Sequence, residues 1–293
     1  AALLGRLNHA VLIGIWKGPL YYRALQRQYI TGVTRTGCFK ASKNCQLALT
    51  KQALQELEWW SLTQLFQLNQ MSLILPPFDM TIWTDASKKG WGAAYLDRKT
   101  GGQWAMDKEK AHINVLELKA AYLAIQSFVK DMKSLPRHIL LLMDNLTAVC
   151  YVNKRGGTRS PQLVSLATEI WNFCLGRNIW ITAKHVPGVE NVDADCASRQ
   201  FLNHTEWTLD RKLFQQITQR YYLPEVDLFA SRINNQLPKY IARYPDPGSI
   251  ATDAFLQNWN KWTLFIHPPV VLLPRILQKI RNDQATSLLI APA

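Results

Sequence analysis

Four acidic residues each lie at the edge of an apolar segment, where a strand ends or a helix begins: Asp85, Glu117, Asp144 and Asp195. The edge of a sheet is where metal sites assemble, because strand ends and helix starts meet there. Mg²⁺ keeps part of its water shell and binds a few carboxylates together with phosphate oxygens of a substrate. The pattern therefore predicts phosphodiester chemistry.

Two of these residues also have a purely structural explanation. Asp85 precedes the polar stretch that ends at Gly90, so it could be a turn aspartate that supports its own backbone. Glu117 follows Asn114 by three positions, and the two could form a capping box at the start of a helix. Neither residue alone predicts a metal site.

The other two acidic residues indicate a metal site only when all four are considered together. Asp144 could cap a helix, and Asp195, with Asp193 as a competitor, could favour a helix start through the helix dipole. If the strand that ends at Asp85 lies beside the strand that ends at Asp144, Glu117 arrives on the intervening helix. Clustered carboxylates repel one another unless cations neutralise them, so together they predict a metal pair.

Size and charge favour a globular protein with an anionic partner. The chain has 293 residues, of which 48% are hydrophobic and 19% charged, enough for two or three domains. Its net charge of +13, from 34 basic and 21 acidic residues, makes nucleic acid the leading candidate partner. A basic protein whose charge serves only solubility is the alternative.

Cysteine use and apolar runs indicate an intracellular protein of the cytoplasm or nucleus. The five cysteines contain no CxxC pair, so they predict neither a disulfide framework nor a zinc site. No apolar run is long enough to cross a bilayer, and no signal peptide is expected. The chain starts without Met and stops in an apolar stretch, which we interpret as a piece of a longer polypeptide.

The periodicity of apolar residues predicts three successive segments. Residues 1 to 75 are helical in pattern, and Pro76-Pro77 ends them. The next segment is expected to contain strands at 81–85, 91–96, 103–106, 138–143 and 179–184, a turn at 97–102, and helices at 115–129, 146–153 and 161–175. This order predicts an α/β fold with a mixed five-stranded sheet and helices on both faces.

The remainder of the chain predicts a small, separate α/β segment that could be truncated. We expect a helix at 211–221, an apolar run at 226–230, a polar, proline-rich loop, a strand at 262–266, a helix at 274–281 and a last strand at 287–290.

Several motifs in the central segment resemble those of retroelement ribonuclease H domains, in the same order and over residues 80 to 200. They are Thr84-Asp-Ala-Ser87, Leu116-Glu-Leu-Lys-Ala120, Met143-Asp-Asn145 and His185-Val-Pro-Gly-Val-Glu-Asn-Val-Asp-Ala-Asp195. The stretches 112–120 and 153–160 are similar to those of DIRS-type retrotransposons, whose polyprotein joins reverse transcriptase, ribonuclease H and a methyltransferase-like segment.

This resemblance implies endonucleolytic hydrolysis of the RNA strand of an RNA–DNA hybrid by two Mg²⁺ ions, with Mn²⁺ as a substitute. Asp85, Glu117, Asp144 and Asp195 would hold the metals, one of which activates water while the other stabilises the leaving 3′ oxygen. His185 matches the mobile-loop histidine of the family, with a role in proton transfer or product release; an exposed loop histidine is the alternative.

Polar and basic residues near these motifs are candidates for contact with the hybrid. By position, the short polar side chains are Ser87, Asn145 and Thr147, which could sense the 2′-hydroxyl. The phosphate candidates are Lys88, Lys89, Lys154, Arg155 and Arg159, although such surface charges can also be merely solvated.

The flanking segments complete the predicted domain organisation. Residues 1–78 resemble the thumb of a reverse transcriptase, 79–202 the ribonuclease H-like domain, and 203–293 a degenerate adenine-methyltransferase-like segment. No Tyr-x-Asp-Asp motif occurs, so the polymerase palm of the same polyprotein is an expected partner. His267 and Val270 stand where active methyltransferases have Asn or Asp and an aromatic residue, which argues against methylation.

Two other functions stay open. The chain could be an inactive module that binds nucleic acid, or a DNA adenine methyltransferase. Cleavage of the RNA strand is favoured because all four carboxylates and His185 are present.

Overall fold

The structure is a computed structural model that describes residues 1–12, 14–15, 17–36, 48–61, 75–104, 111–130, 132–199 and 208–292. The predictions for residues 62–74, for the end of the strand at 103–106, and for Cys38 and Cys45 lie outside this part of the chain. Two compact units make up the protein: Ala1–Met80 with Pro136–His185, and Thr81–Leu135 with Val186–Ala293.

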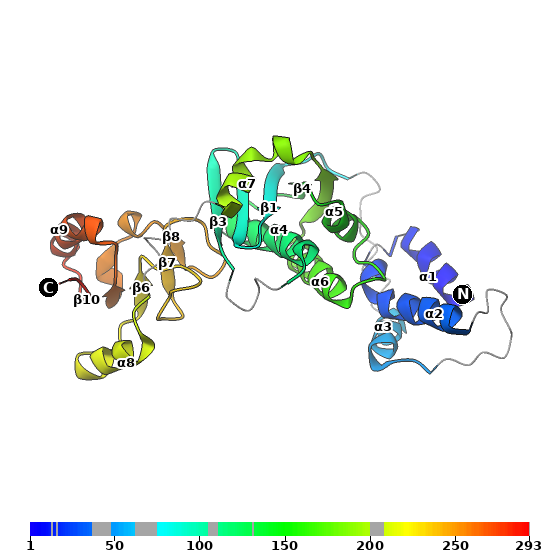
Figure 1. Cartoon of the computed structure of the whole chain (residues 1–293), viewed down its shortest axis with the longest axis horizontal. Helices are drawn as coiled ribbons and strands as arrows, with labels where there is room; N and C mark the ends of the chain where they lie inside the picture. Colours follow the sequence, from blue (N-terminus) through cyan, green and yellow to red (C-terminus); the bar gives the residue numbers. More distant parts are fainter. Residues whose placement is uncertain are drawn as a thin grey trace. The chain divides into compact units, whose positions relative to one another are not determined.

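A mixed five-stranded sheet has the strand order β3-β2-β1-β4-β5 (Figure 1). β1 pairs with β2 and β2 with β3 in antiparallel fashion, whereas β4 and β5 are parallel. The sheet thus confirms the predicted fold class and the adjacency of the first and fourth strands. Its strands are β1 (Met80–Ala86), β2 (Gly90–Tyr95), β3 (Arg98–Gln103), β4 (His138–Met143) and β5 (Trp180–His185).

The third strand starts earlier than predicted. Tyr95 pairs with Arg98, so only Leu96 and Asp97 form the turn, and Leu96 has φ of 53°. Most of the predicted turn at 97–102 is therefore β3, and that prediction was wrong. Its polar and glycine-rich sequence is typical of a loop, but a two-residue hairpin turn leaves these residues in the strand.

Helices cover both faces of this sheet, as predicted. Phe128 of α4 contacts the ring of Tyr95, with ring centroids 5.8 Å apart. Gly92, three positions earlier in β2, faces the opposite side and lies against the backbone of α7. The helices are α4 (Ile113–Lys130), α5 (Leu146–Asn153), α6 (Pro161–Leu175) and α7 (Val192–Arg199).

The N-terminal segment forms three α-helices in its described part, which fits the predicted helical pattern. They are α1 (Ala2–Leu12), α2 (Arg23–Thr36) and α3 (Lys51–Ser61). Glu56 of α3 is buried and accepts hydrogen bonds from the backbone amides of Ala24 and Leu25, at the start of α2. These amides have no partner within the helix, so Glu56 joins the two helices.

The C-terminal segment contains a second five-stranded sheet, with the order β10-β9-β6-β7-β8 and all neighbours parallel. Its strands are β6 (Val226–Leu228), β7 (Tyr240–Ala242), β8 (Ala251–Thr252), β9 (Leu264–Ile266) and β10 (Ser287–Leu289). The helices α8 (Arg211–Arg220) and α9 (Leu273–Asp283) agree with the predicted ones. β7 and β8 were missed because they are two or three residues long and lie in the proline-rich stretch predicted as loop.

None of the helices in the described ranges is long and apolar enough to cross a membrane.

Candidate active site

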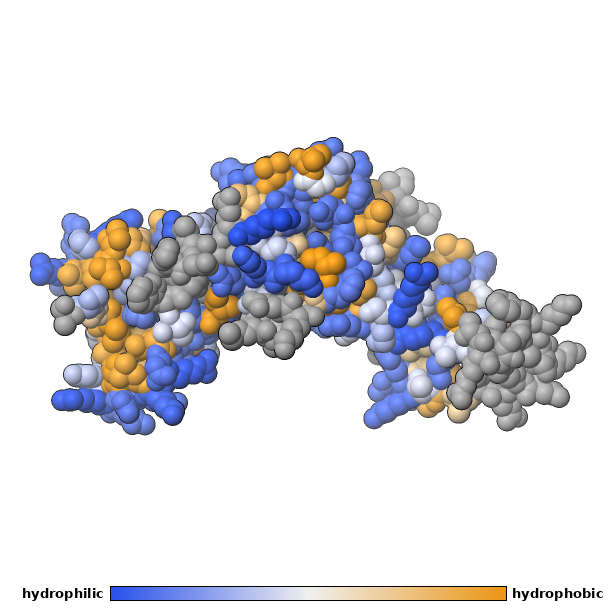
Figure 2. All heavy atoms as spheres, in the orientation of Figure 1, coloured by the Kyte–Doolittle hydropathy of each residue, from blue (hydrophilic) through white to orange (hydrophobic). Residues whose placement is uncertain are grey.

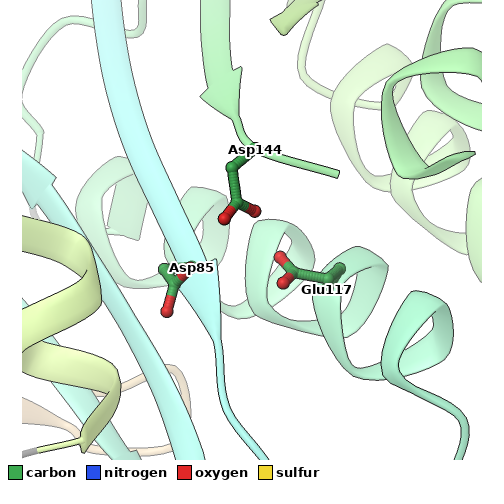
Figure 3. A group of neighbouring side chains, drawn as sticks. All are labelled: Asp85, Glu117 and Asp144. Carbon is green, nitrogen blue, oxygen red and sulfur yellow. The ribbon is translucent and has the colours of Figure 1, made fainter. Parts of the chain in front are cut away.

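Three of the four predicted carboxylates converge at one point of the first sheet. Asp85, Glu117 and Asp144 each offer an oxygen, and these oxygens all lie within 4.8 Å of one another. Figure 3 shows the three side chains directed toward a common space, from β1, from α4 and from the end of β4. Asp85 and Glu117 are buried, and Asp144 is the most exposed. The site is thus accessible from the side of Asp144.

Asp85 lies at the end of β1, which two residues from the segment after β5 support. The hydroxyl of Ser198 donates to Asp85 Oδ2. Next to it, the Asn191 side-chain amide donates to the carbonyl of Thr84 at 2.9 Å, and both groups are buried. The end of β1 is therefore tied to the segment that contains α7.

Asp144 directly follows β4, and its neighbour performs the capping role. Asn145 is the N-cap of α5, and its side chain accepts from the amide of Ala148 at 2.9 Å. Nε2 of His185 lies 3.1 Å from the carbonyl oxygen of Asp144, which can only accept, so Nε2 carries the proton. In the neutral ring Nδ1 is then a proton acceptor. His185 is exposed and lies beside the acidic group.

Glu117 lies inside α4, and the predicted capping box is absent from this helix start. α4 begins at Ile113, so Asn114 is a helical residue and cannot be the N-cap. Instead, Nδ1 of His112 accepts from the amide of Asn114 at 3.2 Å. The alternative structural role of Glu117 was therefore wrong, and its carboxylate is directed to the acidic group (Figure 3).

Asp195 lies in α7 and is not a member of the three-carboxylate group. Its Oδ1 accepts from Nε of Arg199 at 2.6 Å, one helical turn further on. Asp193, the competing candidate, makes an ion pair with Lys99 of β3 at 2.6 Å. The hydrogen bond to Asp193 raises the pKa of Lys99. Metal binding by Asp195 stays a prediction.

The short polar candidates for hybrid contact are partly committed to local structure. Ser87 Oγ donates to the carbonyl of Ser198 at 2.7 Å and accepts from the amides of Lys89 and Gly90. It thus connects the turn after β1 with α7. Asn145 caps α5, whereas Thr147 lies half-buried in the first turn of that helix.

The basic candidates differ strongly in exposure. Lys154 and Arg159 are exposed, but the guanidinium of Arg155 lies over the rings of Trp171 and Trp180, at 5.6 and 5.4 Å from their centroids. Burial lowers the pKa of Arg155, which stays a cation in this aromatic setting. Lys154 and Arg159 are therefore better placed than Arg155 to contact a phosphate.

Two supporting residues were missed in the sequence. Ser198 and Asn191 carry no charge and gain their roles only from contacts with β1, more than one hundred positions earlier. The available signal was their place in the motif around Asp195: Ser198 lies three positions after Asp195, and Asn191 four positions before it.

Apolar side chains are exposed between His185 and Asp195. Figure 2 shows a hydrophobic patch over the yellow-green segment that Figure 1 labels α7. Val189 and Val192 in this stretch are 85% and 63% exposed. These two side chains offer no charge to a phosphate.

Comparison with solved structures finds ribonuclease H chains at low similarity. LC11 ribonuclease H1 in complex with an RNA/DNA hybrid is 18% identical, covers 41% of this chain and 93% of its own, and has a TM-score of 0.36. Ribonuclease H1 from the halophilic archaeon Halobacterium salinarum NRC-1 is 18% identical, with coverages of 40% and 92% and a TM-score of 0.33. At these TM-scores the matches add no weight to the geometry of the site.

A reverse transcriptase is also similar over part of its length. The prototype foamy virus protease-reverse transcriptase is 12% identical, covers 54% of this chain and 22% of its own, and has a TM-score of 0.26. No protein-family model matches the chain, and no curated protein matches it.

Proposed function

We propose that this protein hydrolyses the RNA strand of RNA–DNA hybrids at the acidic group of Asp85, Glu117 and Asp144. The observation that carries the proposal is the convergence of their oxygens within 4.8 Å, from β1, from helix α4 and from the end of β4. The ordered motifs around these residues, similar to those of retroelement ribonuclease H domains, support the choice of substrate.

The donor set fits a hard divalent cation. Mg²⁺ binds oxygen at about 2.1 Å, so two oxygens on opposite sides of one ion lie roughly 4.2 Å apart. The bound of 4.8 Å exceeds this by little more than half an ångström, which a small side-chain rotation can remove. Two such ions would supply Lewis acidity at the attacked phosphate and neutralise the carboxylates. Asp85, Glu117 and Asp144 would hold them.

Asp195 and His185 complete the proposed machinery. Asp195 is the fourth predicted ligand, and the largely exposed Arg199, paired with its Oδ1, would compete with a metal for this carboxylate. His185 has an acceptor at Nδ1 when its ring is neutral, so it can take up or deliver a proton beside Asp144. An excess of basic residues favours the anionic substrate, and the exposed candidates for phosphate contact are Lys88, Lys89, Lys154 and Arg159.

The wider context is proposed from sequence motifs. The protein would act within a DIRS-type retrotransposon polyprotein, with residues 1–78 as a thumb-like segment, 79–202 as the nuclease and 203–293 as a methyltransferase-like segment. The polymerase palm of the same polyprotein would be its partner. The three helices α1, α2 and α3 are compatible with a thumb.

Cleavage of a labelled hybrid tests the proposal. With Mg²⁺ or Mn²⁺ the protein should cut the RNA strand and spare the DNA strand, and Asp144→Asn should lose about 10³-fold or more in rate. Asp97→Asn is the matched control, since Asp97 is exposed in the turn between β2 and β3. Intact RNA with the unchanged protein, over a range of metal and salt, would reject the nuclease.

Binding without cleavage would support the second function, an inactive nucleic-acid-binding module. Hybrid affinity measured by fluorescence anisotropy separates the cases, because it depends on the basic surface more than on the acidic group. A protein that binds the hybrid tightly but shows no cleavage would belong to this class.

Adenine methylation by residues 203–293 is a third candidate that the parallel sheet favours. The carboxyl ends of β6 and β9 lie at the point where the strand order reverses, the usual place for a ligand in such sheets. Phe229 and His267 directly follow these strands, and burial lowers the pKa of His267. Calorimetry with S-adenosylmethionine tests this function, and no heat of binding would remove it.

A further inference from the structure

Ser198 is a buried hydroxyl in contact with the acidic group. It lies in α7 with no exposed surface, and its Oγ is 2.5 Å from Asp85 Oδ2 and 2.9 Å from the carbonyl of Asp195. A hydroxyl has one proton to donate, and a carboxylate is a stronger acceptor than a neutral carbonyl. We therefore assign the proton of Ser198 to the bond with Asp85.

The backbone of Ser198 is held independently of its side chain. Its carbonyl accepts from Ser87 Oγ at 2.7 Å. Its amide nitrogen lies so close to β2 that a Cβ added to Gly92 would come within 2.4 Å of it. Because the main chain is fixed from two sides, the hydroxyl cannot follow Asp85 if that carboxylate rotates.

A fixed hydroxyl on one carboxylate oxygen sets the orientation of the whole group. Turning Asp85 away would break the bond to the Ser198 hydroxyl, which would be left with the weaker carbonyl acceptor of Asp195. Hydrogen-bond partners behind a metal ligand commonly change metal affinity by about 10- to 100-fold. The role of Ser198 therefore goes beyond helix packing, because its hydroxyl determines where the Asp85 oxygens point.

We propose that Ser198 is a positioning residue, whose hydroxyl orients the Asp85 carboxylate for a divalent cation and ties α7, with Asp195, to the end of β1. The inference rests on the proposed metal-dependent function of the acidic group. It adds a specific requirement, namely that the bond from Ser198 determines metal affinity.

The test measures Mn²⁺ binding by calorimetry on the full chain, without nucleic acid. Ser198→Ala should weaken Mn²⁺ binding by about 10- to 100-fold and raise the Mg²⁺ concentration needed for half-maximal cleavage. The matched control is Ser127→Ala, because Ser127 is also a buried helix serine, but its hydroxyl donates only to the carbonyl of Leu123. The control should keep the Mn²⁺ affinity even if its melting temperature falls.

Ser198→Thr keeps the hydroxyl and covers the case in which Ser198→Ala fails to fold. A folded threonine variant that keeps Mn²⁺ affinity within about threefold supports the inference, since threefold is only about 0.65 kcal/mol. A folded threonine variant that has lost Mn²⁺ binding, or an alanine variant that binds Mn²⁺ like the unchanged protein, overturns it.

The two proposals can fail separately. If the unchanged protein binds Mn²⁺ but cuts no hybrid, the nuclease is rejected while the comparison of Ser198 variants still decides the positioning role. If the unchanged protein cuts hybrids and Ser198→Ala binds Mn²⁺ normally, only the positioning role is rejected. An unchanged protein without Mn²⁺ binding rejects both.

Discussion

Gly92 and Gly101 face each other across β2 and β3, and both lie against the backbone of α7. A Cβ at Gly92 would come within 2.3 Å of the carbonyl oxygen of Ala194, and one at Gly101 within 2.9 Å of that of Ala197. No side chain fits between this helix and these strands. The close approach positions α7, and with it Ser198 and Asp195, next to β1.

Gly92→Ala should therefore displace α7 from the sheet. We expect a loss of about 1–3 kcal/mol in stability from overpacking, and both weaker Mn²⁺ binding and slower hybrid cleavage, because Ser198 and Asp195 move with α7. Thermal unfolding and cleavage rates check this. Gly102→Ala is the control, since its added Cβ would meet no atom closer than 3.4 Å. Equal losses of stability and cleavage in the two variants would contradict the conclusion that Gly92 allows α7 to pack closely on β2.

Arg199→Gln should change metal dependence with little effect on stability. The pair of Arg199 and Asp195 is exposed, with 64% and 40% of the two side chains accessible, so its loss should cost well under about 1 kcal/mol. Removal of a competing cation should lower the Mg²⁺ concentration for half-maximal cleavage about two- to fivefold. Lys99→Gln, which breaks the pair with Asp193, is the control. A higher Mg²⁺ requirement would instead mean that Arg199 orients Asp195.

Asp227 should make the C-terminal segment less stable as pH rises. Burial raises the pKa of Asp227 from 3.8 to about 7, although the amide of Gln236 donates to it. A raised pKa in the folded state means that the stabilisation is complete below pH 3.8 and is lost as the pH rises toward 7. The shift corresponds to at most about 4 kcal/mol.

Asp227→Asn should remove this pH dependence and exceed the unchanged protein in stability at pH 8. Urea unfolding followed by tryptophan fluorescence at pH 5 and pH 8 measures the effect. Asp210→Asn is the control, because Asp210 caps α8 and asparagine caps nearly as well. If the free energy of unfolding falls with pH equally in the Asp227→Asn variant and in the unchanged protein, the Asp227 carboxyl is not the cause of the pH dependence.

Glu56→Ala should destabilise the N-terminal helices. It leaves the amides of Ala24 and Leu25 buried without an acceptor, at a cost of roughly 2–4 kcal/mol for the pair. Glu58→Ala on the exposed side of the same helix should have little effect. Differential scanning calorimetry compares the two, and similar unfolding temperatures would argue against the joining role of Glu56.

The sequence predicted the sheet and three members of the acidic group because acidic residues at strand ends leave a local signal. Asp85 and Asp144 follow apolar strands, and the alternation of elements places those strands together. Ser198 left no such signal, since a serine in a short helix has many ordinary roles. The same limit explains β3, whose glycines suggested a turn but instead admit α7.

The acidic group has a consequence for folding. Its carboxylates come from β1, α4 and the end of β4, so only the folded chain brings them within 4.8 Å. A cation that binds there binds the native state and not the unfolded one, and mass action then adds about 2.7 kcal/mol of stability at a hundredfold excess over Kd. Divalent metal would thus act as a folding ligand, and its chelation would lower the melting temperature even without nucleic acid.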